Sequence, residues 1–354
     1  MIDGKTRADP PGFPKSSGRD ANVSASRIVP DGLEGPERGY AAKGGEGMAI
    51  LLADVGGTNA RMALARDGAL ASGTITRFRG DDHASFDEVV TKFLAQQGSP
   101  RIDAVCVAVA GPVWGDEARL TNRDWTFSEA RLCALSGAPR ARLINDLTAL
   151  GYATPALDGE AAGFLRAAPE GALSNGQRLV VNAGTGFNVC AVKVLPDGGI
   201  ACLEAEEGHT RLPLSVADPL AEALGDAGRA IDSVEELFAG RGLARLHALR
   251  MGTPQGRAET VVAAAAEGDG AAEETLALYA RLFGLLCREL ALRFMPMDGM
   301  FLAGSVARSC TDRFEIFERA FLSDPLMARI PQAVPVGVIR DDMAALHGCL
   351  AAIR

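Results

Sequence analysis

Asn145-Asp146 is a pair of residues whose types and position could carry a reaction. It ends a short apolar segment and precedes Leu-Thr-Ala-Leu, which begins like a helix. A carboxylate at the carboxyl end of a strand lies at the mouth of an α/β cleft, where ligands usually bind. Transfer of a phosphoryl group to an alcohol needs an oriented hydroxyl, a base to accept its proton, and cations around the phosphoryl group. Asp146 could be this base, and it could equally well be the N-cap residue of the helix.

A second polar segment, residues 206–209 (Glu-Glu-Gly-His), follows an apolar segment at 200–203 that we expect to be a strand. Carboxylate and imidazole groups this close together in a turn can hydrogen-bond neighbouring hydroxyls of a sugar. His209 alone is weak evidence, because a lone histidine is more often structural than functional. No second histidine stands at a metal-ligand spacing, so we expect no metal site built by the protein alone. Glu235 reads as an exposed helix residue.

Two glycine turns have the composition of phosphate-binding loops. Gly56-Gly57-Thr58-Asn59 stands between two apolar segments, and Gly184-Thr185-Gly186 stands in the same position of a second pair. Glycines let a backbone approach an anion closely, and the N–H groups of the turn then point at phosphate oxygens. Thr58 and Asn59 would add side-chain donors. Each turn alone also fits an ordinary hairpin, whereas two matching turns favour phosphate binding.

The two turns belong to an internal repeat. Residues 51–64 align with 179–192, and each copy has an apolar strand, a polar residue (Asp54 or Asn182), a Gly-Thr turn and a second apolar strand. The repeat predicts one unit used twice, once in each of two domains, with a nucleotide held between the turns. Asp54 could hold magnesium through water. Gly304 fits a turn that passes under an adenine, or equally a plain strand-to-helix turn.

The elements that must position these residues follow an α/β pattern. The chain has 354 residues, of which 47% are hydrophobic, and this length more often forms two domains than one. Strands alternating with helices favour layered α/β domains. We expect strands at 49–53, 61–65, 73–78, 104–110, 143–144, 200–203 and 300–303, and helices at 86–94 and 273–294.

Composition excludes several classes of function. A net charge of −9 argues against a general nucleic-acid binder, and no run of eighteen apolar residues predicts a membrane span. The seven cysteines include no CxxC pair and stand mostly in apolar surroundings, which predicts buried, reduced thiols in a cytoplasmic protein. Residues 1–47 are rich in Gly, Pro, Ser and charge and have no apolar period. We expect them to form a disordered extension, with the folded protein starting at Met48.

Together these motifs resemble the bacterial glucokinase family, within the hexokinase and actin-like ATPase superfamily. The resemblance extends from Met48 to the C-terminus, and the order and spacing of its motifs are more specific than any one of them. The segments that carry it are 53–61 (ADVGGTNAR), 110–113 (AGPV), 121–125 (TNRDW), 144–149 (INDLTA), 184–186 (GTG), 206–209 (EEGH) and 301–304 (FLAG).

The resemblance implies a ribonuclease H-like (actin-like ATPase) fold with two α/β domains around a cleft. The small domain would comprise 48–156, completed by a C-terminal helix at 341–353, and the large domain 157–340. The activity implied is ATP-dependent phosphorylation of D-glucose at the 6-hydroxyl, with magnesium, in a homodimer. No nucleic-acid or membrane partner is expected.

The resemblance also assigns roles to individual residues. Asp146 matches the general base of the family. The positions that bind glucose hydroxyls correspond to Asn145, Glu206, His209 and Glu235. The phosphate turns correspond to Gly56, Gly57, Thr58 and Asn59 with the neighbouring Asp54, and to Gly184, Thr185 and Gly186, while Gly304 matches the adenosine turn.

Three residues depart from the family pattern. Glu207 and Asn188 stand where glycine is usual, and Ser305 replaces the second glycine of the adenosine turn. Glu207 places a second carboxylate beside Glu206, and like charges that close raise one pKa unless the side chains diverge. These departures leave two alternatives to a glucokinase: a kinase for another hexose, and a non-catalytic sugar-sensing homologue.

Overall fold

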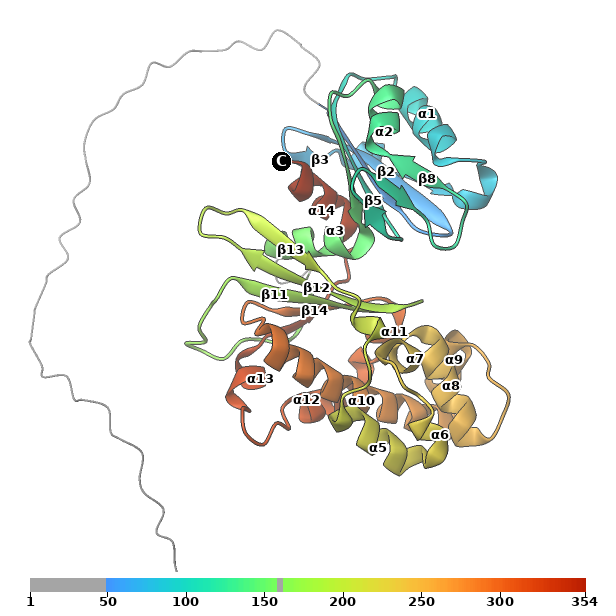
Figure 1. Cartoon of the computed structure of the whole chain (residues 1–354), viewed down its shortest axis with the longest axis vertical. Coiled ribbons are helices and arrows are strands. Elements are labelled where there is room, and N and C mark those ends of the chain that lie inside the picture. The colour runs from blue at the N-terminus through green and yellow to red at the C-terminus, as the bar shows by residue number, and fades with distance from the viewer. Residues whose placement is uncertain (1–48, 158–161) are drawn as a thin grey trace, which may run out of the picture. The chain divides into compact units, whose positions relative to one another are not determined.

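The computed structural model describes residues 49–157 and 162–354, and the described residues belong to one compact unit (Figure 1). The disordered extension that we expected at 1–47, together with Met48, lies outside the described residues. Within them, no helix combines the length and the apolar character needed to cross a membrane.

The first sheet is built around an antiparallel hairpin that continues into parallel strands. The hairpin strands pair from Ala49 with Arg66 to Val55 with Ala60, and the first of them also pairs in parallel with the strand at Ile102–Val109. The strand order is β3 (Ala69–Leu70), β2 (Asn59–Arg66), β1 (Ala49–Val55), β5 (Ile102–Val109) and β9 (Ala141–Asn145), with β4 (Thr76–Arg79) paired to β2.

The second sheet repeats this topology. Its hairpin is followed by a third antiparallel strand on one side and by two parallel strands on the other, so the predicted internal repeat is confirmed as a repeat of structure. The order is β13 (Ile200–Glu204), β12 (Phe187–Val194), β11 (Gln177–Ala183), β14 (Met300–Ala303) and β15 (Val336–Val338), with β10 (Phe164–Arg166) antiparallel at the edge.

Two short helices each follow one sheet and pack on the other. Helix α3 (Asp146–Ala153) follows the first sheet, but Leu147 and Ala153 pack with Val180 of the second. Helix α14 (Ala344–Ile353) ends the chain and packs on the first sheet, where Leu346 contacts the core around Leu52. The two helices also contact each other directly. The C-terminal helix begins three residues after the start that we expected at 341.

Helix α10 (Gly270–Phe294) is the longest helix and contains the one that we expected at 273–294. Its apolar residues form the core beneath the second sheet, and the buried Tyr279 hydroxyl donates to the Phe238 carbonyl at 2.6 Å. The other helices there are α5 (Leu214–Leu224), α6 (Asp226–Arg229), α7 (Val234–Phe238), α8 (Gly240–Met251), α9 (Ala258–Ala266), α11 (Ser305–Ser309), α12 (Phe314–Phe321) and α13 (Arg329–Ala333).

Two helices and a small sheet pack against the first sheet. Helices α1 (Phe86–Gln96) and α2 (Glu129–Ser136) pack on one face, and a small sheet of β6 (Val113–Trp114), β7 (Glu117–Arg119) and β8 (Thr126–Ser128) joins the same core. The strand that we expected at 73–78 is shorter than predicted. Residues Ser72–Thr74 form a 3₁₀ turn, because the Thr74 hydroxyl donates to the Ala71 carbonyl and accepts from the Leu64 N–H.

Candidate active site

Asp146 lies where the first sheet passes into α3, at the boundary that the sequence predicted. The N-cap of this helix is Asn145, whose Oδ1 accepts from the Leu147 N–H at 2.9 Å. The Asp146 carboxylate accepts from the same N–H. Burial, followed by repulsion from Asp54, raises the pKa of the Asp146 carboxyl to about 6, against the opposing effect of the Leu147 hydrogen bond. Because Asn145 is the N-cap of α3, the Asp146 carboxyl group is not needed for capping and can act as a base.

Asp54 lies near the end of β1, opposite Arg61 in the hairpin register. Its Oδ2 is 3.7 Å from Arg61 Nη1. Burial raises the pKa of the Asp54 carboxyl, and the Arg61 charge opposes the shift. The Arg61 guanidinium also donates to the carbonyl of Asp342, just before α14. Asp54 is thus a partly exposed carboxylate, with 27% of its side chain accessible and Arg61 as its cationic partner.

A pocket of about 200 Å³ brings the two carboxylates together with residues of the second sheet. Asp54 comes from β1, Asp146 from α3, and Gly304 from the turn between β14 and α11. The remaining lining residues are Leu150, Ala303, Arg308, Ile339, Asp341, Asp342 and Ala345. Three of the predicted site residues therefore share one pocket.

Sequence reasoning missed the charged residues Arg308, Asp341 and Asp342 in this pocket. Arg308 stands one helical turn after Gly304, and its N–H donates to the Gly304 carbonyl. Asp341 and Asp342 are adjacent carboxylates at the start of the helix that we expected at 341–353, as Asp146 stands at the start of the helix after Asn145. These residues could have been found from their positions in the sequence. Arg308 follows Gly304 by one helical turn, and Asp341 and Asp342 stand next to the last helix.

Gly304 meets the second glycine turn. Its φ is 90°, and a Cβ there would lie 2.3 Å from the Ala183 carbonyl oxygen, so only glycine fits without displacement. A Cβ on Gly184 would lie 3.6 Å from the Gly304 Cα. The Gly184 N–H donates to the Gly186 carbonyl, which closes the turn. The adenosine turn and the second phosphate turn expected from the sequence are therefore adjacent.

The first glycine turn, Gly56 to Asn59, connects β1 to β2. The Gly56 N–H donates to the Asn59 carbonyl at 2.9 Å, and the Thr58 carbonyl accepts from the Gly80 N–H at 2.8 Å. Arg123 donates from Nε to the Gly57 carbonyl. This turn follows Asp54 closely but is not among the residues that line the Asp146 pocket.

The predicted sugar-binding residues Glu206, His209 and Glu235 gather around the β11–β12 turn. The Glu235 carboxylate, on α7, accepts from the Phe187 N–H at 3.1 Å and pairs with Arg241. Although burial raises the pKa of Glu235, the Phe187 N–H and Arg241 outweigh it and lower the pKa overall. A Cβ at Gly208 would lie 3.3 Å from Glu235 Oε2, so the 206–209 segment passes directly beside it.

These three residues are not among those that line the Asp146 pocket, although α3, which carries Asp146, is bonded to the strand that precedes Glu206. Thr148, on α3, donates to Glu204 at 2.9 Å, which ties α3 to the strand that precedes Glu206. Asn145 donates from Nδ2 to the Gly111 carbonyl. Of the predicted sugar-binding set, Asn145 alone is a chain neighbour of Asp146.

Glu207 does not point at Glu206. It is 7% exposed, and its carboxylate pairs with Arg293 near the end of α10 and accepts from the Thr210 hydroxyl. Glu206 instead accepts from Asn188 Nδ2 at 3.3 Å, while Asn188 Oδ1 accepts from the Glu207 N–H at 3.0 Å. The two carboxylates therefore have different partners. Two of the three departures from the family pattern, Glu207 and Asn188, form bonds that hold the 206–209 segment in place.

The structure has no cluster of three or more His, Cys, Asp or Glu side chains that could hold a metal directly, among residues 49–157 and 162–354. All seven cysteines lie within these ranges, and five of them are buried, as their apolar surroundings predicted.

Comparison with known proteins adds independent findings. The family model described as Glucokinase matches residues 51–354. A glucokinase of Caulobacter sp. (strain K31) is 31% identical over 322 residues, which cover 86% of this chain and 94% of the relative. The crystal structure of a glucokinase from an Antarctic psychrotroph superposes with a TM-score of 0.72 at 25% identity, covering 86% of this chain and 98% of that one.

A more distant structure has the same fold. It is a ROK family glucokinase from Streptomyces griseus in complex with glucose and AMPPNP, with a TM-score of 0.57 at 17% identity, covering 86% of this chain and 99% of that one. These likenesses confirm the actin-like ATPase fold expected from the sequence.

Proposed function

The chain belongs to the glucokinase family, and we propose that it transfers a phosphoryl group from ATP to the 6-hydroxyl of D-glucose, giving glucose 6-phosphate and ADP. The observation that carries the proposal is Asp146, a carboxyl group whose pKa burial raises to about 6 in a pocket shared with Gly304 and Arg308. The glucose and AMPPNP bound by the Streptomyces griseus relative support the same pair of substrates.

Asp146 acts as the general base. With a pKa of about 6 it is mostly ionised at pH 7, yet it is basic enough to accept a proton as the hydroxyl becomes a nucleophile. The 6-oxygen forms a bond to the γ-phosphorus while the bond to the β–γ bridging oxygen breaks. The hydroxyl proton goes to Asp146, and ADP leaves with the electron pair of the broken bond.

The sugar is held by Asn145, Glu206, His209 and Glu235. Glu235 is fixed by the Phe187 N–H and by Arg241, and its lowered pKa keeps it an ionised acceptor for hydroxyl donors. Glu206 is oriented by Asn188. Fixed acceptors reduce the entropy lost on binding and select one orientation of the sugar.

The nucleotide is held by the glycine turns. The Gly184 N–H closes its turn, and the N–H groups of Thr185 and Gly186 would bind phosphate beside Gly304, where the adenosine passes. Gly56 to Asn59 form the matching turn of the first sheet. Arg308 lines the same pocket as Asp146, and its guanidinium would balance the charge of the transferred phosphoryl group.

The residues present fit a magnesium ion. Asp54, Asp341 and Asp342 line one pocket, and burial raises the pKa of the Asp54 carboxyl against the opposing charge of Arg61. Mg²⁺ usually keeps several waters and takes one or two carboxylates together with substrate phosphates, which agrees with the lack of a direct three-ligand cluster in the described residues. When bound, the ion would neutralise charge on the β- and γ-phosphate oxygens.

The decisive experiment is ADP release from the full chain with magnesium-ATP and a panel of hexoses. Glucose-dependent ADP supports the proposal, and ADP with a different hexose would reassign the substrate while keeping the mechanism. Saturable sugar binding without ADP release, from folded protein, would favour the sugar-sensing alternative. The structure weakens the motivation for that alternative, because Glu207 and Asn188 hold the sugar segment rather than obstruct it. Cytoplasmic location and a homodimer stay predictions from the sequence.

A further inference from the structure

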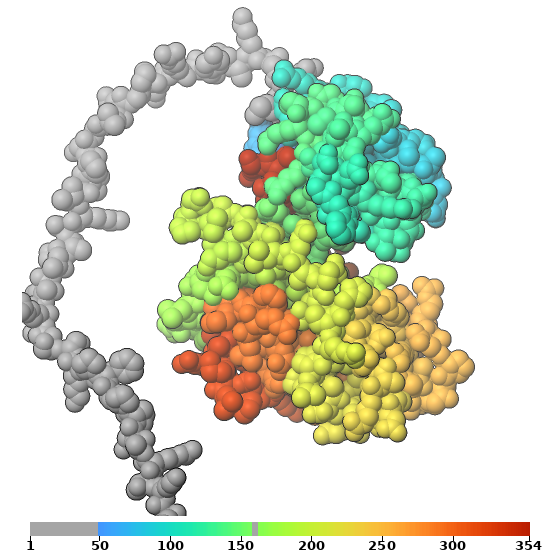
Figure 2. Space-filling model, viewed as in Figure 1, coloured from blue at the N-terminus to red at the C-terminus, as the bar shows by residue number. Residues whose placement is uncertain are grey.

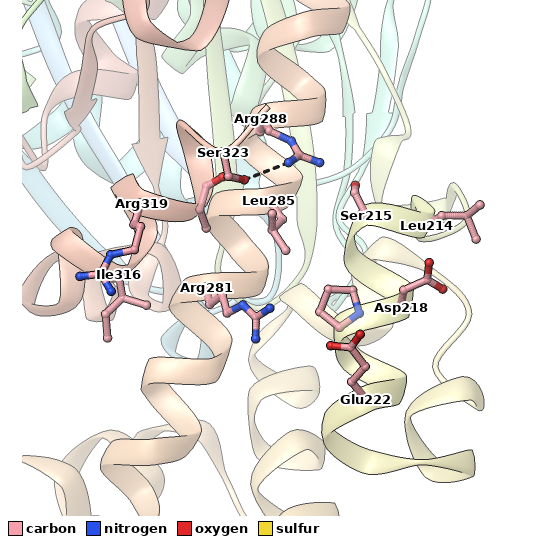
Figure 3. A pocket seen from close by; sticks show the side chains of 12 residues that line it. Leu214, Ser215, Asp218, Glu222, Arg281, Leu285, Arg288, Ile316, Arg319 and Ser323 are labelled. Carbon is pink, nitrogen blue, oxygen red and sulfur yellow. Dashed lines mark hydrogen bonds between the residues drawn. The ribbon is translucent and has the colours of Figure 1, made fainter. Parts of the chain in front are cut away.

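A second pocket lies on the helical layer of the second sheet, away from the residues described so far. Its volume is about 620 Å³, and its walls are α5 on one side and α10 and α12 on the other (Figure 3). The surface of α5 borders that of α10 and α12 on the face drawn in Figure 2. The lining residues are Leu214, Ser215, Asp218, Pro219, Glu222, Arg281, Leu285, Arg288, Ile316, Arg319, Ala320 and Ser323.

The two walls carry opposite charges. Arg281 and Arg288 come from α10 and Arg319 from α12. Asp218 and Glu222 come from α5, and Figure 3 shows Arg281 and Glu222 pointing toward one another across the pocket. No ion pair joins Arg281 or Arg319 to a carboxylate in the part of the chain that the structure describes. Both signs of charge are therefore available to a ligand.

Arg288 is the least solvated of the three arginines, with 9% of its surface exposed. It donates from Nη1 to the Ser323 hydroxyl and from Nη2 to Glu289, both at 2.9 Å. Its buried Nε–H has no acceptor among the described residues. A buried donor without a partner costs free energy, and Arg288 keeps its guanidinium at the wall of the pocket despite that cost.

We propose that this pocket binds a small phosphate ester that carries hydroxyl groups. Guanidinium groups present paired donors that match phosphate oxygens, so Arg281 and Arg288 of α10 would provide the phosphate end. Asp218 and Glu222 accept hydrogen bonds from hydroxyls at the opposite wall. Leu285 and Ile316 offer apolar surface to the carbon chain between the two ends.

The same two walls support the sugar segment at 206–209. Helix α10 continues from Arg288 to Arg293, which pairs with Glu207. Helix α5 begins at Leu214, five residues after His209, and its Ser215 donates to Glu289 beside Arg288 at 2.7 Å. A ligand that draws α5 and α10 together therefore acts on both supports of this segment, through a contiguous set of contacts. The effect on sugar affinity rests on the proposed function, whereas binding of the ester does not.

Isothermal titration calorimetry on the full chain, without ATP or sugar, tests the site. The probes are sn-glycerol 3-phosphate, inorganic phosphate and glycerol. We expect saturable binding of sn-glycerol 3-phosphate, weaker binding of phosphate and none of glycerol. Arg281→Gln should weaken the ester by roughly tenfold, because it removes a charge-assisted hydrogen bond from an exposed residue that folding does not need. Arg329→Gln, at an exposed arginine outside the pocket, should leave binding unchanged.

Two further measurements separate this site from the proposed active site. Arg308→Gln, in the Asp146 pocket, should not alter ester binding, and the ester should change the dissociation constant for glucose by severalfold in wild type but not in Glu207→Gln. Ester binding that survives Arg281→Gln, that is lost in Arg308→Gln, or that inorganic phosphate equals would overturn the proposal. A change of sedimentation coefficient in Arg281→Gln would also overturn it, because the pocket would then belong to an interface between two copies.

Discussion

The two sheets share one topology, and the end of the last parallel strand carries carboxylates in both. Asp146 follows β9 directly, and Asp341 follows β15 in the loop before α14. Both line the same pocket, because α3 and α14 cross to the opposite sheets. Their environments differ: burial and Asp54 raise the pKa of Asp146 to about 6, whereas Asp341 keeps 30% of its side chain exposed and caps the next turn through the Met343 N–H. A duplicated scaffold therefore places a carboxylate after the last parallel strand of each sheet, and the two carboxylates have different neighbours.

The largest effect that this comparison predicts is on turnover. Asp146→Asn removes the base but keeps the side-chain shape, and we expect kcat to fall by about 10² to 10⁴, the usual contribution of a general base. Asp341→Asn removes the equivalent carboxylate and should cost less than about tenfold, because it would act on the metal through water. Steady-state ADP release measures both. Equal losses in the two variants would contradict the distinction, and glucose binding by Asp146→Asn is the control for folding.

The packing of helices α3 and α14 can be tested at two glycines, one on α14 that faces α3 and one on α3 that faces the second sheet. A Cβ on Gly348 of α14 would lie 1.7 Å from the Ala149 carbonyl oxygen, whereas a Cβ on Gly151 of α3 would meet the Cys190 and Cys202 sulfurs at 2.9 and 3.0 Å. Backbone cannot move aside as a thiol can. We expect Gly348→Ala to lower the free energy of unfolding by about 3 kcal/mol and Gly151→Ala by about 1 kcal/mol.

Chemical denaturation measures both changes. Gly270→Ala is the matched control, since a Cβ there meets no atom within 4 Å. If Gly151→Ala lowered the free energy of unfolding as much as Gly348→Ala, the expected difference between a backbone contact and a thiol contact would be wrong.

The raised pKa of Asp146 also predicts how stability depends on pH. A carboxyl whose folded-state pKa lies above its unfolded value favours the folded state below about pH 4, and that contribution is lost as pH rises through about 6. Above pH 7 the ionised group costs about 3 kcal/mol of stability. Asp146→Asn should therefore raise the melting temperature at pH 7.5 but not at pH 4. A gain of equal size at pH 7.5 and pH 4 would contradict the raised pKa of Asp146.

The sequence predicted those elements that can be recognised from a few residues close together in the chain. The glycine turns of both hairpins, the polar residue at the end of β9 and the apolar face of α10 each follow from a few neighbouring residues, and the repeat at 51–64 and 179–192 predicted the shared topology. The family resemblance added the fold and the candidate roles.

What the sequence could not predict depends on contacts between distant residues. Nothing near Glu207 indicates Arg293, which stands 86 residues later, and nothing near Leu147 indicates that α3 packs on the second sheet. Such contacts form only in the folded protein, and no periodic pattern of residues in the sequence indicates them. The same reason explains why Arg308, Asp341 and Asp342 were missed: they join the pocket only when β14 and α14 are in place.

The smallest expected effect concerns the Glu207–Arg293 pair, which supports the sugar segment on the second sheet. Arg293 keeps 47% of its side chain exposed, so we expect Glu207→Gln to lower the free energy of unfolding by only about 1 kcal/mol. Because the pair fixes the segment that contains Glu206 and His209, KM for glucose should rise a fewfold while kcat stays the same.

Steady-state kinetics with varied glucose separates this positioning role from a catalytic one. Arg293→Gln should reproduce the KM change, and adding it to Glu207→Gln should cause little further change, because either substitution already breaks the pair. Glu259→Gln removes one partner of an exposed pair with Arg257 and serves as the control. A fall in kcat without a change in KM would mean that Glu207 acts on the reaction itself, and the second sheet would then supply chemistry as well as support.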